Sequence, residues 1–171
     1  EGRVPITPEA SVFDFDCIQD HSGTSEEISV VVFPRELAEE YVAAFDAAGI
    51  TLLSLEVEAR SIARAISHPS REEPMTLLVD FGRARTGFAV LKSGIPIFTS
   101  TVEVGGEAIN RTLSAKLSLP AAEITQFKNE QGLRSSGTPS PGLDAITAVA
   151  SALADEVARH YRYWDTRKNE E

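Results

Sequence analysis

Apolar and polar residues alternate along residues 11–19, so that Phe13, Phe15 and Cys17 lie on one side of the segment and Asp14 and Asp16 on the other. Side chains of a β-strand point to opposite faces in turn. The alternation therefore predicts a half-buried strand whose apolar side faces inward. The β-branched run that follows at residues 28–33 predicts a second strand.

The pattern then changes to helical spacing. Pro34 suits the first turn of a helix, and Gly49 suits its end. Apolar residues between them recur at intervals of three and four and predict an inward face, made of Leu37, Tyr41, Ala44, Phe45 and Ala48. Residues 50–55 predict a third strand, and residues 58–66 predict a short helix with an apolar face. The first part of the chain is thus expected to be a small α/β unit.

A polar segment with prolines at both ends, residues 68–74, separates this unit from the rest. Three apolar runs follow, at residues 76–79 and 87–91 and from residue 95, and predict three strands. Helical patterns then cover residues 105–117 and about 120–130. A long helix comes last, and we expect it to pack on the three-stranded sheet through an inward face of Leu143, Ile146, Val149, Leu153, Val157, Tyr161 and Trp164.

Composition excludes several classes of protein. The formal charge of −10 disfavours non-specific binding to nucleic acid or to an anionic membrane, because such binding needs a face rich in Lys and Arg. Cys17 is the single cysteine, so the chain forms no internal disulfide. No apolar run approaches the ~20 residues that cross a bilayer, so we expect no direct insertion into a membrane. The chain lacks an initial methionine and ends directly after the last helix, so we expect it to be a piece of a longer protein.

The strongest chemical signal is a D-x-G-x-x-x-T pattern at residues 80–86, directly after a predicted strand. Gly82 lets the backbone approach a phosphate group, turn amides can bind its oxygens, and Thr86 adds a hydroxyl. Asp80 can hold a magnesium ion through water, since hard cations prefer oxygen ligands. The heptapeptide by itself is more typical of an Asp-Gly hairpin turn than of a phosphate site, and that alternative stays open.

The surrounding sequence adds a resemblance to known proteins. A strand, the D-x-G turn, a hairpin, a third strand and then Val104-Gly105-Gly106-Glu107 before a helix are similar to the second half of the actin-like ATPase fold. Residues 50–56 with Ala59 and the run Ala63-Arg64-Ala65, preceded by residues 30–36, resemble the type IV pilus assembly family PilM. The resemblance covers nearly the whole chain, from Pro5 to about Trp164.

The resemblance implies an α/β fold, namely a fragment of an actin-like ATPase (ribonuclease-H-like) with a small inserted α/β subdomain. Residues 1–67 would form the inserted subdomain and a connecting helix, residues 68–74 a linker, and residues 75–171 the first part of the second actin-like half. The first phosphate loop and the glycine-rich adenosine loop of the family are absent from this chain. We therefore expect this fragment by itself to bind no nucleotide and to be inactive.

The resemblance also implies ATP and magnesium as ligands of the full-length protein. Asp80 would serve a catalytic role and hold magnesium indirectly, while the nucleotide would be bound by Asp80, Gly82, Arg83, Thr86, Gly105, Gly106 and Glu123. Two departures from the family pattern bear on the rate of ATP hydrolysis. Arg83 and Arg85 stand where the family has small residues, and the lysine expected soon after Glu123 comes only at Lys128. We therefore expect weak ATPase activity at most.

As a function, the resemblance implies a cytoplasmic scaffold for type IV pilus or related secretion assembly, peripheral to the inner membrane through its partners. Its partners would be the N-terminal cytoplasmic tail of a PilN-like membrane protein and other pilus assembly proteins, with self-association left open. Two alternatives remain: an FtsA-like filament-forming ATPase of cell division, and a protein-binding module without nucleotide. A metal site of histidines is not expected, because His21, His68 and His160 share no ligand spacing.

Overall fold

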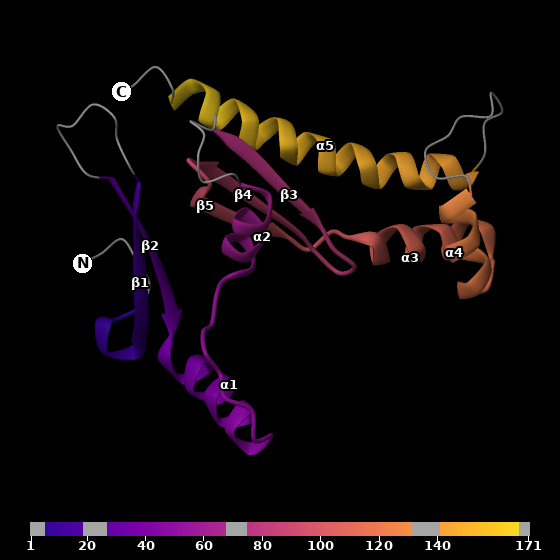
Figure 1. The fold of residues 1–171 in the computed structure, drawn as a ribbon. Helices are drawn as coiled ribbons and strands as arrows, with labels where there is room; N and C mark the ends of the chain where they lie inside the picture. The colour runs from indigo at the N-terminus through magenta and orange to yellow at the C-terminus, as the bar shows by residue number, and fades with distance from the viewer. Residues whose placement is uncertain (1–5, 19–26, 68–74, 131–140, 168–171) are drawn as a thin grey trace. The chain divides into compact units, whose positions relative to one another are not determined.

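The computed structural model describes residues 6–18, 27–67, 75–130 and 141–167 and confirms a mixed α/β fold (Figure 1). The chain divides into two compact units. Unit 1 comprises Glu1–Thr76 with Val90–Phe98, and unit 2 comprises Leu77–Ala89 with Thr99–Glu171. Within the described ranges, no helix is both long and apolar enough to cross a membrane. The predicted linker at residues 68–74 lies outside the described residues.

Unit 1 begins with a two-stranded antiparallel ribbon. After a short 3-10 helix, Pro8–Ala10, strand β1 (Ser11–Ile18) pairs with β2 (Glu27–Pro34) in a register that joins Phe15 to Val30. Helix α1 (Arg35–Ala47) follows β2 directly and helix α2 (Glu58–Ile66) comes later, as the sequence predicts. Gly49 has a φ of +69°, and this left-handed conformation, which favours glycine, ends α1.

The sides of β1 and α1 that are buried differ from the sides that the sequence predicted to be buried. Phe13 and Phe15, expected inside, expose 70% and 57% of their surface, whereas Asp16 is partly buried and forms a bidentate ion pair with Arg60 of α2. The paired carboxylate can turn inward because Arg60 neutralises it. The predicted inward face of α1 is also wrong, since Leu37 and Tyr41 are exposed and α1 has no buried residue.

The predicted strand at residues 50–55 is also incorrect. The structure gives this segment no regular secondary structure, and no described strand pairs with it. A strand needs hydrogen bonds from a neighbour, so β propensity by itself does not create one. Leu53, which would lie in such a strand, exposes 91% of its surface.

Polar contacts join the ribbon to the other parts of unit 1. The Ser29 hydroxyl donates a hydrogen bond of 2.6 Å to the Pro96 carbonyl, and Lys92 forms an ion pair with Glu27 at 2.6 Å. Pro96 and Lys92 belong to the tip of a hairpin, where Ser93 and Gly94 have φ values of 51° and 76°. Positive φ at both central residues is typical of a type I′ turn. Unit 1 is therefore assembled from segments far apart in the sequence.

The hairpin is part of a three-stranded sheet, through which the division between the units passes. Its order is β3-β4-β5, and all three predicted strands are confirmed, as Thr76–Phe81, Thr86–Lys92 and Ile95–Val102. β4 is central, which explains why four consecutive residues, Phe88 to Leu91, are buried.

Three helices complete unit 2: α3 (Gly106–Leu117), α4 (Ala121–Glu130) and α5 (Pro141–Arg167). Leu113, Ile124 and Ile146, one from each helix, form its buried cluster. The expected packing of α5 on the sheet is confirmed, because His160 stacks at 4.9 Å on Phe88 of β4. The inward residue at this level is His160, which is 6% exposed, rather than the predicted Tyr161, which is 62% exposed.

Candidate phosphate-binding site

The D-x-G pattern forms the turn between β3 and β4. Asp80 lies near the end of β3, and residues 82–85 form the loop before Thr86 starts β4. The Gly82 amide donates to the Arg85 carbonyl at 2.9 Å, which closes the loop. The amides of Arg83 and Ala84 donate to no described residue. These two consecutive N–H groups are available to bind an anion.

The start of α3 docks against the same loop. The amides of Gly106 and Glu107 donate to the carbonyls of Gly82 and Arg83 at 3.0 and 2.8 Å. These are among the first N–H groups of the helix, which lack partners within it and commonly bind phosphate. Here they bind the loop, so the start of α3 fixes the position of the loop, and the Gly106 and Glu107 amides are already occupied.

Gly105 is required by this close approach. A Cβ atom at Gly105 would lie 2.6 Å from the Gly82 oxygen, 2.7 Å from the Arg83 oxygen and 2.9 Å from the Ala84 carbonyl carbon. All three are backbone atoms, which cannot rotate away as a side chain does. At Gly106 the nearest atom would be the Lys128 Nζ at 3.7 Å, an ordinary contact distance. The two glycines therefore have different roles.

The hydroxyl of Thr86 is hydrogen-bonded within the protein and is not open to solvent. Thr86 is fully buried, at 0% exposure, and its Oγ1 donates a hydrogen bond of 2.6 Å to the Val104 carbonyl. This bond fixes the first residue of β4 against the segment that leads into α3. The predicted contact of Thr86 with phosphate would require this hydroxyl to become accessible.

Asp80 and the loop arginines present charge. Asp80 is partly buried, and its carboxylate makes no hydrogen bond or ion pair with a described residue. The Arg83 side chain is 89% exposed and pairs with Glu107 at 3.4 Å. Across the described ranges, no group of three or more His, Cys, Asp or Glu residues could hold a metal ion. The predicted role of Asp80, holding a magnesium ion through water, stays a prediction.

Helix α4 carries one predicted site residue, Glu123, and a second charged residue, Lys128, that was not predicted to bind the nucleotide. Glu123 is exposed in the first turn and contacts no described residue by hydrogen bond or ion pair. Lys128, in contrast, extends to the start of α3 and donates to the Asn110 Oδ1 at 2.8 Å. Lys128 follows the buried Ile124 by four residues, so helical periodicity places both on the inward face. This spacing is the feature of the sequence that could have predicted the inward position of Lys128.

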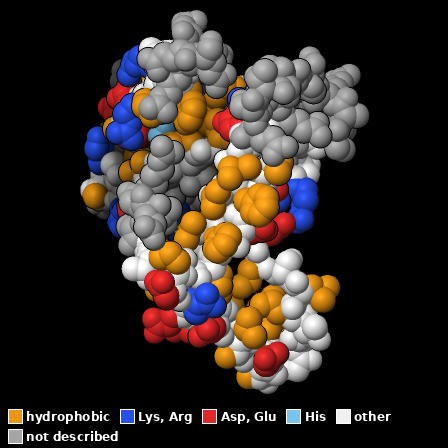
Figure 2. All heavy atoms as spheres, turned by 90° about the vertical axis from the view of Figure 1, so that its left-hand side faces the viewer, with side chains coloured by type: hydrophobic (Ala, Val, Ile, Leu, Met, Phe, Trp, Pro, Cys, Tyr) orange, Lys and Arg blue, Asp and Glu red, His pale blue; other side chains and the backbone are white. Residues whose placement is uncertain are grey.

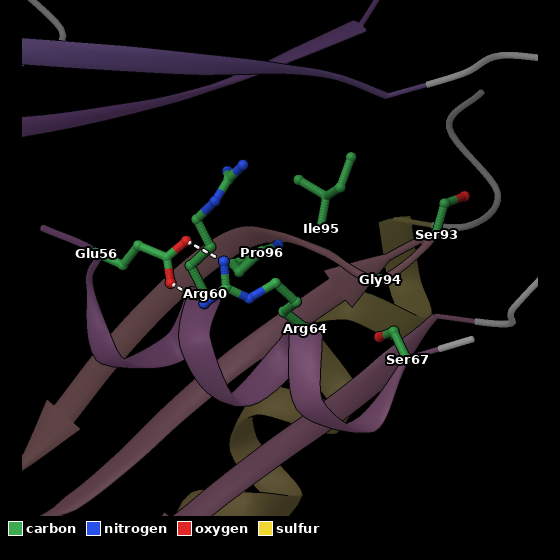
Figure 3. Close-up of a pocket in the computed structure, with 8 residues that line it drawn as sticks. All are labelled: Glu56, Arg60, Arg64, Ser67, Ser93, Gly94, Ile95 and Pro96. Atoms are coloured by element: carbon green, nitrogen blue, oxygen red, sulfur yellow. Dashed lines mark hydrogen bonds and ion pairs between the residues drawn. The ribbon is translucent and has the colours of Figure 1, made fainter. Parts of the chain in front are cut away.

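A separate pocket of about 330 Å³ lies in unit 1, between α2 and the tip of the β4–β5 hairpin (Figure 3). Two arginines line it. Arg60 pairs with Asp16, and Arg64 pairs with Glu56 at 2.7 Å. Each guanidinium already has a bidentate carboxylate partner, so the pocket offers no uncompensated charge to an anionic ligand. The loop at residues 80–86 is the stronger candidate site.

Comparison with known proteins places these features in a family. The family model described as type IV pilus assembly protein PilM matches residues 1–170. No curated protein matches the sequence. A chain from a solved PilM–PilN type IV pilus biogenesis complex is similar, with a TM-score of 0.69 at 19% identity over 96% of this chain. The ethanolamine utilization protein EutJ from Carboxydothermus hydrogenoformans matches 76% of this chain and 42% of its own at 22% identity, with a TM-score of 0.49.

This chain spans 48% of the length of the PilM–PilN neighbour chain, or about half. The expected actin-like ATPase fold is confirmed by that neighbour, and the family by a model that covers nearly every residue. The chain belongs to the type IV pilus assembly protein PilM family.

Proposed function

We propose that the full-length protein is a nucleotide-binding scaffold of type IV pilus assembly, in which this chain supplies one side of the nucleotide site. The observation that carries the proposal is the loop at residues 82–85. Its Arg83 and Ala84 amides lack a described partner, and it follows the unpaired carboxylate of Asp80. Amides and a carboxylate in this order suit a phosphate group with its magnesium ion.

In this proposal each residue has a limited task. The Arg83 and Ala84 amides donate hydrogen bonds to phosphate oxygens, and the Asp80 carboxylate accepts hydrogen bonds from water bound to magnesium. Magnesium, when bound, neutralises phosphate charge and polarises the phosphoryl group. Gly105 and Thr86 hold the loop in shape through the backbone contacts described above. Lys128 adds a positive charge at the start of α3.

Hydrolysis is expected to be slow. Rapid phosphoryl transfer needs a positioned water and stabilised transition-state charge on both sides of the nucleotide. The Arg83 side chain is exposed, and its ion pair with Glu107 lies at the surface, where such pairs are weak. Arg83 therefore supplies little positive charge at a fixed position. We therefore propose that nucleotide acts as a structural clamp between the two halves of the protein.

The proposed partner is the N-terminal cytoplasmic tail of a PilN-like membrane protein. The similar solved chain comes from a complex that is titled PilM–PilN, which supports this choice. Through that tail, and through other pilus assembly proteins, the scaffold would lie on the cytoplasmic side of the inner membrane. The net charge of −10 suits a protein partner better than an anionic lipid surface.

The test is a titration of the full-length protein with ATP and magnesium. Calorimetry measures the affinity, and the release of phosphate measures hydrolysis. Asp80→Ala is expected to weaken binding by at least about tenfold, since it removes a charged group from the site. Asp46→Ala, which changes an exposed aspartate at the end of α1, is the matched control and should leave affinity unchanged. Equal affinity of Asp80→Ala and wild type would refute the phosphate assignment.

Phosphate release and partner binding separate the remaining alternatives. Tight binding with slow release supports the scaffold, whereas rapid release together with ATP-dependent sedimentation would favour the FtsA-like filament ATPase. Absence of any nucleotide binding would leave the protein-binding module. Capture of the PilN-like tail by the full-length protein is expected, and failure of that capture would contradict the proposed partner.

A further inference from the structure

Lys128 of helix α4 lies near the loop of the candidate site. It is partly buried, and its Nζ donates a hydrogen bond of 2.8 Å to the Asn110 Oδ1 of α3. A Cβ atom at Gly106 would lie 3.7 Å from that Nζ, 3.9 Å from the Gly82 oxygen and 4.0 Å from the Arg83 oxygen. The ammonium group and the backbone of the loop therefore approach the same point, at the first residue of α3.

The charge of Lys128 is not balanced by an acid among the described residues. Arg60 and Lys92, which are also partly buried, each pair with a carboxylate. On the face of the molecule that Figure 2 shows, Lys and Arg side chains likewise lie among those of Asp and Glu. Within the described ranges, Lys128 is bonded only to the neutral amide of Asn110. A charged group that is removed from water normally has an opposite charge beside it.

The start of α3 makes a cation there still less favourable. The first N–H groups of a helix carry partial positive charge, so a lysine at this end is destabilising and an acid is stabilising. Glu107 is the acid in the first turn of α3, but it pairs with Arg83 at 3.4 Å. The positive end of α3 and the ammonium of Lys128 therefore act in the same direction, and an anion would stabilise both.

Lys128 also keeps hydrogen-bond donors that no described residue uses. An ammonium group has three N–H donors, and the bond to Asn110 takes one of them. That bond fixes the direction of Nζ without neutralising its charge. The amides of Arg83 and Ala84, which donate to no described residue, belong to the loop that docks on the same end of α3. Ammonium and amide donors together suit the oxygens of a phosphate group.

From these contacts we propose that Lys128 binds a phosphate group of the nucleotide, together with the Arg83 and Ala84 amides. This inference rests on the proposed function and adds to it a cation at a fixed position. Arg83 does not supply one, because its side chain is 89% exposed and pairs with Glu107 at the surface. Lys128 thus contacts phosphate and not the nucleoside.

The experiment measures the affinity of the full-length protein for ATP with magnesium, pyrophosphate with magnesium, and adenosine, by calorimetry. Lys128→Met removes the charge but keeps an unbranched side chain that favours a helix. We expect this substitution to weaken the binding of ATP and of pyrophosphate at least about tenfold, because a charge-assisted hydrogen bond is lost. The affinity for adenosine, which has no phosphate group, should not change.

Two variants and one stability measurement are the controls. Lys116→Met changes an exposed lysine in the last turn of α3 and should leave every affinity unchanged. Lys128→Arg keeps the positive charge and should recover most of the affinity that Lys128→Met loses. Without nucleotide, the unfolding temperature of Lys128→Met should not fall below that of the wild type, because the substitution takes a cation away from the positive end of α3.

The outcomes separate this inference from the proposed function. ATP binding that depends on Asp80 but is equal in the wild type and in Lys128→Met would overturn the inference alone. An equal loss of ATP and adenosine binding would also overturn it, because Lys128 would then contact the nucleoside or hold α4 in place. So would a lower unfolding temperature of Lys128→Met with unchanged affinities. If the wild-type protein binds neither ATP nor pyrophosphate, the proposed function and this inference are both wrong.

Discussion

Gly105 determines whether the candidate site keeps its shape. We predict that Gly105→Ala destabilises the protein by about 1–3 kcal/mol, as overpacking commonly does. The added Cβ would lie within 2.9 Å of three backbone atoms of the loop, so the loop must move. Chemical denaturation of the two proteins measures the difference. Gly106→Ala is the matched control and should cost less than about 1 kcal/mol, because its nearest contact is 3.7 Å. Equal losses would contradict the close approach.

At the same residue scale, the sequence predicted which residues surround the loop better than it predicted their tasks. The D-x-G pattern and the glycine pair before a helix drew attention to Gly82 and Gly105, but the need for glycine at position 105 comes from its approach to the backbone of residues 82–84. The buried bond of Thr86 to Val104 joins residues 18 apart, and Lys128 reaches Asn110 across the same separation. Such contacts depend on how β4, α3 and α4 pack, which no local pattern specifies.

At the scale of elements, the three-helix cluster of unit 2 depends on Leu113. This residue is 0% exposed and belongs to one buried cluster with Ile124 of α4 and Ile146 of α5. We predict that Leu113→Ala lowers the free energy of unfolding by about 2–5 kcal/mol, because it leaves a cavity in a packed interior. Lys116→Ala, at an exposed position of the same helix, should change it by less than about 0.5 kcal/mol. Thermal unfolding followed by circular dichroism compares them, and similar melting temperatures would place Leu113 outside the core.

Periodicity predicted the elements of the chain well where the pattern was long or the turn chemistry was specific. The bounds of α2 and the end of α1 at Gly49 are examples. It failed at residues 50–55, since pairing with a neighbour is not encoded in the segment itself. It also assigned the wrong faces to β1 and α1. An amphipathic pattern shows that one side is apolar, but the neighbouring surface decides whether that side is buried.

At the scale of the whole molecule, the composition of unit 1 leads to a prediction about independent folding. Ser29 and Glu27 of the ribbon bind Pro96 and Lys92, which follow residue 74 in the sequence. A fragment of residues 1–67 would lose both contacts. A two-stranded ribbon is marginally stable in water, and α1 has no buried residue to hold it. We therefore expect that fragment to be largely unfolded.

Amide hydrogen exchange and the dispersion of the NMR spectrum measure this, with the 171-residue chain as the control. The amides of β2 should exchange at least about tenfold faster in the fragment, because local opening then needs little free energy. A dispersed spectrum with protected β2 amides in the fragment would show that the ribbon and α1 fold without the hairpin. In that case unit 1 would be an autonomous subdomain, and its contacts with Pro96 and Lys92 would be a docking interface rather than part of its fold.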